Sequence, residues 1–271
     1  MKIFNYSFEV NKIKKYDASI NGNNIKFGWK RDLPDPRDFK YKMSLPIELP
    51  ELIDLREFDP DIYNQLESNS CTANAMGGAF QFEQKNQGKP DFMPSRLFIY
   101  YNTRVIEGTV NIDGGATLRN TMKTVVSDGV CPESKWNFNL SNISTKPNCC
   151  CYHVAKKNQV LQYLRVTHDL TEIKKCLAEK HPVVFGYMVF SSFMTEEVAI
   201  TGIAPVPNPS TEQLLGGHAI VAVGYDNSKN SLIIRNSWGT GWGLNGYFYM
   251  PYEFITIPNL AADFWTIRLV E

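Results

Sequence analysis

The chain has 271 residues, which is enough for one large domain or two lobes with a sizeable core. Hydrophobic residues make up 43% and charged residues 21%, a globular composition that argues against disorder of the whole chain. Lysine plus arginine equal aspartate plus glutamate at 28 each, so the overall charge favours neither nucleic acid nor an anionic membrane as a partner.

The N-terminus shows no apolar core of a secretion signal, and no stretch approaches the roughly 20 apolar residues that span a bilayer. We therefore expect a soluble protein. Six cysteines, three of them consecutive at 149–151, do not form the pattern of a dense disulfide scaffold. They favour a reducing location, such as the cytoplasm or the interior of a virus particle.

Residues 1–44 are predicted to form a leader. The part up to about residue 30 is polar and rich in asparagine, and the run that follows, which continues past residue 44, contains Pro34, Pro36, Pro46 and Pro50. Proline fixes its own backbone and disfavours helix in the residue before it. We therefore expect an extended run that crosses a surface.

The rest of the chain changes from helical to strand-like patterns. Helices are expected at 71–87, 95–107, 116–127 and 171–180, from the spacing of apolar residues and from the glycine and proline that follow. Strands are expected at 183–190, 218–226, 231–238 and 246–250, which are β-branched or aromatic runs. A polar loop is expected at 136–151. The pattern predicts an α+β fold, with a mainly helical lobe at 45–155, a mainly β lobe at 156–271 and a cleft between them.

Cys71 begins the first predicted helix, with Ser70 as its expected N-cap. A thiol attacks as its thiolate, which the N-terminus of a helix stabilises. His218 could accept the thiol proton, and Asn236 on a neighbouring strand could hold the imidazole. The Gln65 side chain and the Cys71 backbone N–H could stabilise an oxyanion. These residue types indicate nucleophilic catalysis.

Three separated motifs resemble the papain and cathepsin family of cysteine proteases. They are NQLESNSC at 64–71, GGHAIVAVGYD at 216–226 and NSWGTGWGLNGYFYM at 236–250, with Gln65 six residues before Cys71. The resemblance implies a helical lobe packed on a β-barrel lobe, and peptide hydrolysis through an acyl-enzyme without cofactor or metal. It assigns catalysis to Cys71, His218, Asn236 and Gln65. It also assigns substrate contacts to a second set of residues: Asp113, Gly114, Gly115, Gly217, Ala219 and Trp238. The Trp238 ring is further expected to shield the His–Asn hydrogen bond from water.

Departures from the family pattern indicate which members of the family this sequence resembles most. Thr72 stands where the family usually has tryptophan, and Ser68 and Ile112 stand where it has a disulfide pair. The sequence is more similar to the compact family members found in bacteria and large DNA viruses than to the animal lysosomal enzymes. The partners implied are a peptide or protein substrate, together with the chain's own N-terminal segment as an autoinhibitory pro-segment. The alternative interpretation of that segment is a structural arm that packs away from the site.

Two alternative functions share these motifs, namely a binding protein that has lost activity and an acyl transferase with the same Cys–His chemistry. A zinc site formed by Cys149, Cys150, Cys151 and His153 is disfavoured, because adjacent cysteines cannot easily all face one ion. A cluster of loop thiols, or one disulfide to Cys131, is the expected arrangement.

Overall fold

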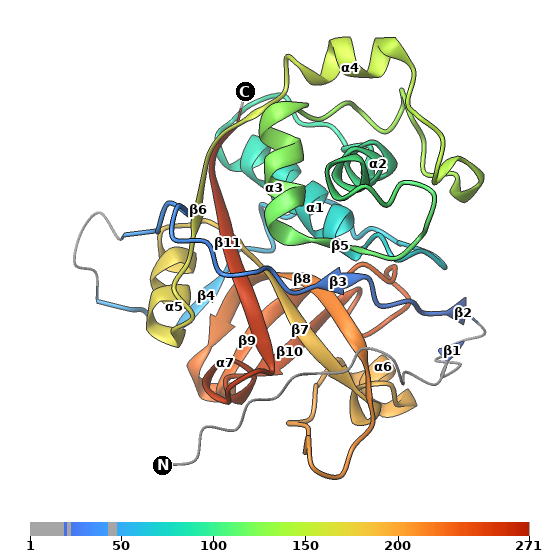
Figure 1. Cartoon of the computed structure of the whole chain (residues 1–271). Helices are drawn as coiled ribbons and strands as arrows, with labels where there is room; N and C mark the ends of the chain where they lie inside the picture. Colours follow the sequence, from blue (N-terminus) through green and yellow to red (C-terminus); the bar gives the residue numbers. More distant parts are fainter. Residues whose placement is uncertain (1–18, 21–22, 43–47, 271) are drawn as a thin grey trace.

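The computed structural model describes residues 19–20, 23–42 and 48–270. Most of the leader's first part and the expected boundary at 44/45 lie outside the described residues. Two packed halves are visible in Figure 1, with helices α1–α4 gathered in one and a large twisted sheet in the other. The α+β class is therefore correct.

The helical half contains α1 (Cys71–Asn86), α2 (Arg96–Glu107), α3 (Leu118–Ser127) and α4 (Cys149–Ala155). The Ser95 hydroxyl caps α2 by accepting from Phe98 N–H, and Gly108 ends the same helix in the left-handed conformation. The predicted loop at 136–151 is partly wrong, since it contains the 3₁₀ turn η2 (Leu140–Asn142) and the start of α4.

The main sheet has seven strands in the order β10-β9-β8-β7-β11-β6, with β4 also paired to β8. Every pairing is antiparallel. No hydrogen-bonded pairing joins the end strands β10 and β6 among the described residues, so the closed barrel that the resemblance implied is not shown. The strands are β4 (Leu52–Asp54), β6 (Val160–Arg165), β7 (Val183–Phe190), β8 (Leu214–Asp226), β9 (Ser231–Arg235), β10 (Tyr247–Pro251) and β11 (Ala261–Val270).

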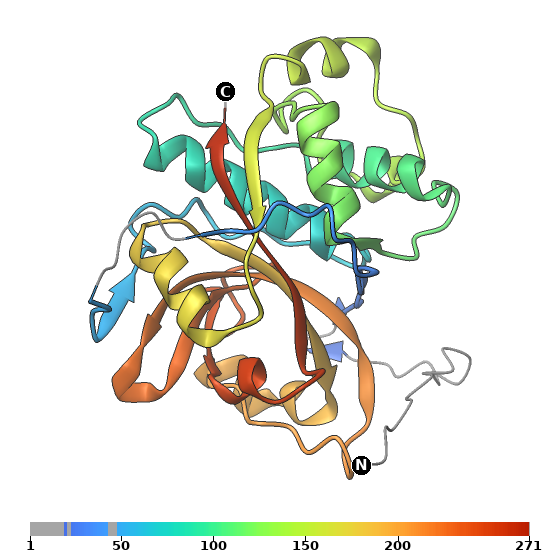
Figure 2. The ribbon, with the colours of Figure 1, turned by 60° about the vertical axis from the view of Figure 1, so that its left-hand side comes forward.

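The shorter helices accompany this sheet: α5 (Leu170–Ala178), α6 (Glu196–Thr201), α7 (Glu253–Thr256) and the 3₁₀ turns η3 (Ser191–Phe193) and η4 (Asn227–Lys229). Strands β6 and β11 were not predicted. Figures 1 and 2 show β11 running from the sheet half up beside the helical half. The two halves therefore share a long pair of strands.

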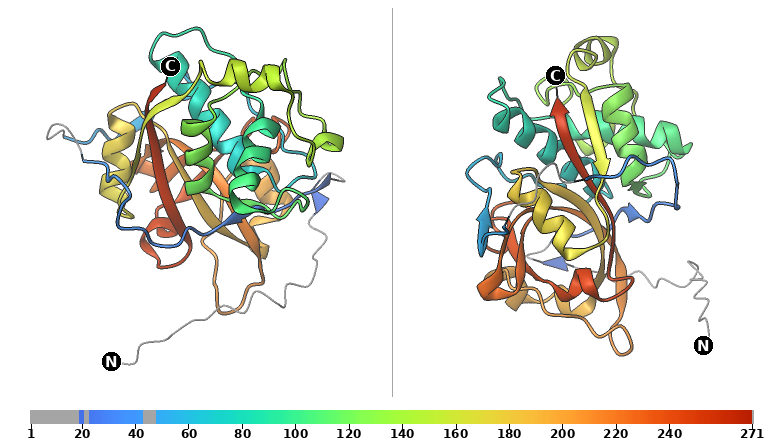
Figure 3. Two further views of the ribbon diagram at one scale, coloured as in Figure 1. Left: turned by 45° about the horizontal axis from the view of Figure 1, so that its top comes forward. Right: turned by 90° about the vertical axis from the view of Figure 1, so that its left-hand side faces the viewer.

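The described part of the leader runs between the two halves. Strand β3 (Trp29–Lys30) pairs in parallel with β5 (Ala116–Thr117) of the helical half. Upstream, β1 (Ser19–Ile20) pairs with β2 (Asn23–Asn24). Both views in Figure 3 show the blue chain continuing from β3 across β11. The leader thus passes the place where the two halves meet.

Candidate active site

Cys71 is the first residue of α1 and is fully buried. The expected cap by Ser70 is wrong, because its side chain makes no capping hydrogen bond. Its hydroxyl instead contacts the Ser68 hydroxyl at 2.7 Å and accepts from Asn74 Nδ2 at 3.0 Å. The backbone of this turn is therefore held from both sides, while the thiol stays at the free N-terminus of the helix.

His218 lies on β8 and Asn236 directly after β9, which pairs with β8. The His218 Nε2 and Asn236 Oδ1 atoms are 2.9 Å apart. The Ser237 backbone N–H donates to the same Oδ1 at 2.8 Å, which identifies that atom as an acceptor. The Nε2 atom therefore carries the proton, and Nδ1, which has no hydrogen-bond partner in the described part of the chain, is the nitrogen that can accept one.

Trp238 covers the His–Asn pair. Its ring stacks on the His218 imidazole at 4.9 Å between centroids and 29° between planes. Trp242 packs edge-on against Trp238, with 4.9 Å between the ring centroids. The resemblance placed Trp238 at this histidine, and the geometry shows how an apolar ring can keep water from the imidazole.

Gln65 is fully buried beside the start of α1, and Ser237 orients it. The Ser237 hydroxyl donates to Gln65 Oε1 at 2.7 Å, and the Gln65 backbone N–H donates to the Ser237 carbonyl at 2.8 Å. Since Ser237 also contacts Asn236, it links the residue that holds the histidine to the expected oxyanion donor. Sequence reasoning missed this role, although Ser237 lies inside the Asn-Ser-Trp motif.

Leader residues 24–30, here called the cleft segment, occupy this site. Gln65 Nε2 donates to the Lys26 carbonyl oxygen at 3.1 Å. The Gly28 backbone lies at the Cys71 thiol, as does the backbone of Ala219. Gly28 fits because it has no side chain: a Cβ there would stand 1.8 Å from the Asn69 carbonyl oxygen.

Two aromatic side chains of the cleft segment flank Gly28. The Phe27 ring meets His218 and Trp238 edge-on, each at 6.4 Å between centroids. Trp29 is only 5% exposed and packs on Gly186 of β7, where a Cβ would stand 1.9 Å from its ring. The described leader therefore fills the site with backbone and with two large apolar rings.

The covered site disfavours charge on both Cys71 and His218. Burial raises the pKa of Cys71 to about 11, which outweighs the hydrogen bonds from Ala219 and Gly28. Burial also lowers the pKa of His218 to about 4, against the opposing effect of its bond to Asn236. The neutral thiol and imidazole are therefore favoured while the leader excludes water. The thiolate–imidazolium pair stays a prediction for the open enzyme.

The predicted substrate-contact residues fall into two groups. Gly115 and Gly217 touch the cleft segment: a Cβ would stand 1.9 Å from the Gly28 carbonyl oxygen at Gly115, and 2.6 Å from that of Trp29 at Gly217. Gly114 is exposed at the rim. The Asp113 carboxylate forms an ion pair with Lys26 of the cleft segment at 3.6 Å. It also accepts from Tyr100 Oη at 2.7 Å and from the Asn69 backbone N–H at 3.1 Å. Asp113 thus braces the loop before Cys71.

The departures from the family pattern have structural counterparts. The Thr72 hydroxyl is buried without a hydrogen-bond partner among the described residues. Ser68 is buried and donates to the Gln65 carbonyl at 2.6 Å, whereas Ile112 is 65% exposed. Ser68 therefore stabilises the loop locally, with a hydrogen bond where the family pattern has a disulfide.

All six cysteines lie in the described part of the chain and are free thiols. Cys131 and Cys151 are buried with their sulfur atoms in hydrogen-bond contact, while Cys149 and Cys150 are exposed. Of the two expected arrangements, the structure shows thiols without the disulfide. Over residues 19–20, 23–42 and 48–270, no group of three or more His, Cys, Asp or Glu is placed to hold a metal ion.

Comparison with known proteins identifies the family. The model of the papain family cysteine proteases matches residues 49–257. An uncharacterized peptidase C1-like protein of Acanthamoeba polyphaga mimivirus is 40% identical, covering 90% of this chain and 87% of its own length. The chain belongs to the papain family of cysteine proteases.

Solved structures agree as well. The crystal structure of xylellain, a cysteine protease from Xylella fastidiosa, is 40% identical with a TM-score of 0.84, covering 90% of this chain and 96% of that one. Procathepsin L 3 from the larval midgut of Tenebrio molitor is 17% identical with a TM-score of 0.68, covering 86% and 74% respectively, and shares the fold. Among the described residues, no helix is both long and apolar enough to cross a membrane.

Proposed function

We propose that this protein is a cysteine endopeptidase that is made as a zymogen, with the cleft segment as its inhibitor. One observation carries the proposal: the Lys26 carbonyl accepts a hydrogen bond from Gln65 Nε2, the amide expected to hold a substrate oxyanion. A peptide backbone thus already lies at the catalytic groups. The division into a helical lobe at 45–155 and a β lobe at 156–271 is part of this proposal.

In the open enzyme, His218 Nδ1 accepts the Cys71 proton and the sulfur attacks the carbonyl carbon of the scissile bond. Gln65 Nε2 and the Cys71 N–H stabilise the oxyanion. The C–N bond breaks, the amine takes the proton from the imidazolium, and a thioester remains. Water then attacks this thioester with His218 again as base, which releases the acid and restores the thiol.

The geometry of the cleft segment explains why it can inhibit without being cut. The Gly28 backbone presents a hydrogen bond to the Cys71 sulfur, which is a donor where a substrate would present an electrophilic carbon. The neighbouring Trp29 anchors the segment by burying its ring on Gly186. The segment therefore fills the site with backbone and apolar rings and excludes water from it.

The pocket that holds Trp29 suggests the substrate preference. It is lined by the small residues Gly186 and Gly217, and Trp29 belongs to an apolar cluster that also contains Ala219. We therefore propose that substrates run through the cleft in the direction opposite to the leader and place an apolar side chain in this pocket, two residues before the scissile bond, with Gly114 and Gly115 as further walls. A positional peptide library tests this, and a strong preference for a charged side chain there would refute it.

Dipeptidyl fluorogenic substrates, combined with an epoxide thiol inhibitor, test the function itself. The full chain should show weak hydrolysis that the inhibitor abolishes, and Cys71→Ala should have none. Analysis of the products separates hydrolysis from transfer to an added amine. A folded Cys71→Ala variant that retains substantial turnover would contradict the proposal.

A further inference from the structure

Downstream of the cleft segment, the leader forms a second unit, here called the strap (residues 32–41). It crosses β11 and joins the end of β6. The Arg165 backbone N–H donates to the Phe39 carbonyl, and the Tyr41 N–H donates to the Arg165 carbonyl, both at 2.8 Å. Tyr41 is buried and donates to Glu179 at 3.1 Å. The strap is therefore joined to the body at its downstream end as if it were a strand.

Apolar burial does not hold the middle of the strap. Leu33 is 82% exposed and Phe39 is 75% exposed. A cavity of about 310 Å³ lies between the strap and the residues around β6 and β11. Polar contacts must therefore fix this part of the chain.

Asp32 is the centre of these contacts, and its carboxylate is fully buried. It accepts hydrogen bonds from the Arg119 backbone N–H at 3.0 Å, from Trp265 Nε1 at 3.1 Å and from Arg165 Nη1 at 3.1 Å. The Asp32 backbone N–H in turn donates to the Asp263 carboxylate at 2.7 Å. The body thus surrounds one strap residue from three elements: the start of α3, the end of β6 and β11.

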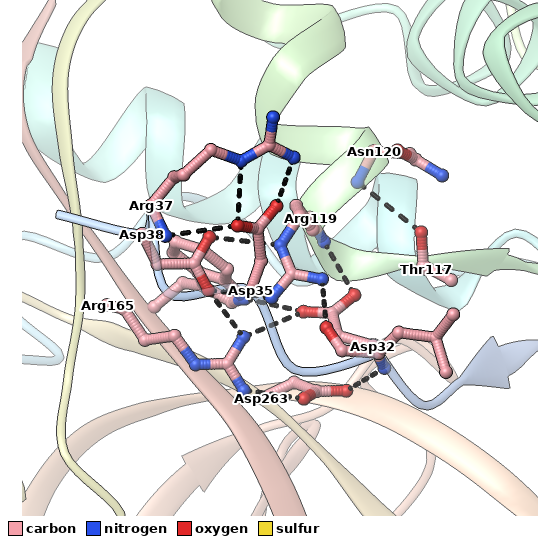
Figure 4. Close-up of polar contacts among 11 residues, drawn as sticks. Asp32, Asp35, Arg37, Asp38, Thr117, Arg119, Asn120, Arg165 and Asp263 are labelled. Carbon is pink, nitrogen blue, oxygen red and sulfur yellow. Dashed lines mark hydrogen bonds and ion pairs between the residues drawn. The ribbon is translucent and has the colours of Figure 1, made fainter.

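Asp38 completes the network, which Figure 4 shows in close-up. Its carboxylate binds Arg119 in a two-point contact, Nε at 3.0 Å and Nη2 at 2.6 Å. The Arg119 side chain is only 10% exposed, and among the described residues Asp38 is the carboxylate that forms an ion pair with its guanidinium. Two arginines of the body, Arg119 and Arg165, are therefore neutralised largely from the strap.

The two parts of the leader have opposite effects on the body when removed. Without the cleft segment, Gln65 Nε2, Cys71 and His218 become accessible, and a complete catalytic site remains. Without the strap, Trp265 Nε1 and the Arg119 backbone N–H lose their acceptor, and the Arg119 guanidinium loses its carboxylate. The body thus loses these hydrogen bonds and the ion pair, each of which contributes to its stability.

We infer that the strap is a permanent part of the catalytic unit, and that the cut which frees the cleft falls at or before the Arg31–Asp32 bond. Arg31 is exposed at this boundary. This inference rests on the proposed inhibitory role of the cleft segment. It assigns a processing boundary inside the leader and makes Asp32 the residue that anchors what remains.

Two full-length chains test the inference, each with one inserted recognition sequence for a specific protease, after Arg31 in the first and after Tyr41 in the second. After cutting, the first chain should lose its leader on gel filtration, gain activity and unfold in a single thermal transition. The second should retain the cut leader on the column and stay inhibited. Release of the leader from the second chain, leaving an active enzyme with the same Tm as the first cut chain, would overturn the inference.

A pair of uncut full-length variants keeps the test independent of the insertions. Asp32→Asn should lower the Tm by about 5 °C or more, because an amide cannot accept at both of its atoms. Asp35→Asn is the matched control, because Asp35 pairs with the exposed Arg37 of the same strap. Equal Tm values for the two variants would contradict the anchor. If the first cut chain gains no activity while Asp32→Asn still lowers the Tm, the inhibitory role of the cleft segment is wrong. The strap is then still a permanent part of the body, anchored by Asp32.

Discussion

Replacing Trp29 by alanine should activate the full-length chain. Trp29 is 5% exposed and is the largest side chain that the cleft segment buries. Removing a buried tryptophan costs about 3–5 kcal/mol in protein cores. If the covered state loses about 3 kcal/mol, the ratio of open to covered enzyme rises about 100-fold, since each 1.4 kcal/mol is a factor of ten.

The assay is kcat/KM for a dipeptidyl fluorogenic substrate, because this value scales with the fraction of enzyme that is open. The increase in kcat/KM ends when all of the enzyme is open. The full increase of about 100-fold is therefore expected only if almost all of the parent enzyme is covered. Phe39→Ala is the control, as Phe39 is an aromatic residue of the same leader that is 75% exposed and lies outside the cleft. A folded Trp29→Ala variant with unchanged or reduced kcat/KM would refute the reasoning.

The remaining predictions are best measured in the activated Trp29→Ala background. Gln65→Ala should lower kcat by on the order of 10–10³-fold as an oxyanion donor, and an unchanged kcat would remove it from the site. Asn236→Ala should impair kcat less than loss of the nucleophile, because it orients the imidazole; an equal loss would give it a larger role. Gly186→Val should shift a peptide library away from large aromatic side chains at the second position, and an unaltered profile would place that pocket elsewhere. Burial raises the pKa of Asp263 to about 6 from 3.8, so its stabilising contribution is present below about pH 4 and is lost as the pH rises through 6. Asp263→Asn should remove that loss, and parallel Tm curves for the variant and the parent would contradict it.

The candidate site could be largely identified from sequence because its residues lie in local motifs. Two local features could be recognised without knowing how the lobes pack. They are the spacing of Gln65 and Cys71, and the two strand motifs that contain His218 and Asn236. Ser237 was missed because a serine hydroxyl has many common uses, and its contact with Gln65 bridges residues far apart in the chain.

Other features depend on tertiary contacts that no local pattern encodes. Gly28 lies in close contact with the backbone at Asn69 and Gly115, where a side chain would clash. The Trp29 ring packs on Gly186, which leaves room for it because glycine has no side chain. Strand β11 was missed, and its pairing with β7 is irregular: Asp263 takes a positive φ of 61° between the paired positions. Without the fold, the strap's aspartates could not be matched with the arginines that hold them.

The central claim is that Cys71 is the nucleophile of a peptidase whose leader covers it. Intact mass and peptide mapping after incubation with an epoxide thiol inhibitor test this claim most directly. The account predicts a single adduct on Cys71 that abolishes turnover, forms faster in Trp29→Ala than in the parent chain, and is absent from Cys71→Ala. An adduct confined to the exposed Cys149 or Cys150, with turnover persisting in Cys71→Ala, would contradict it.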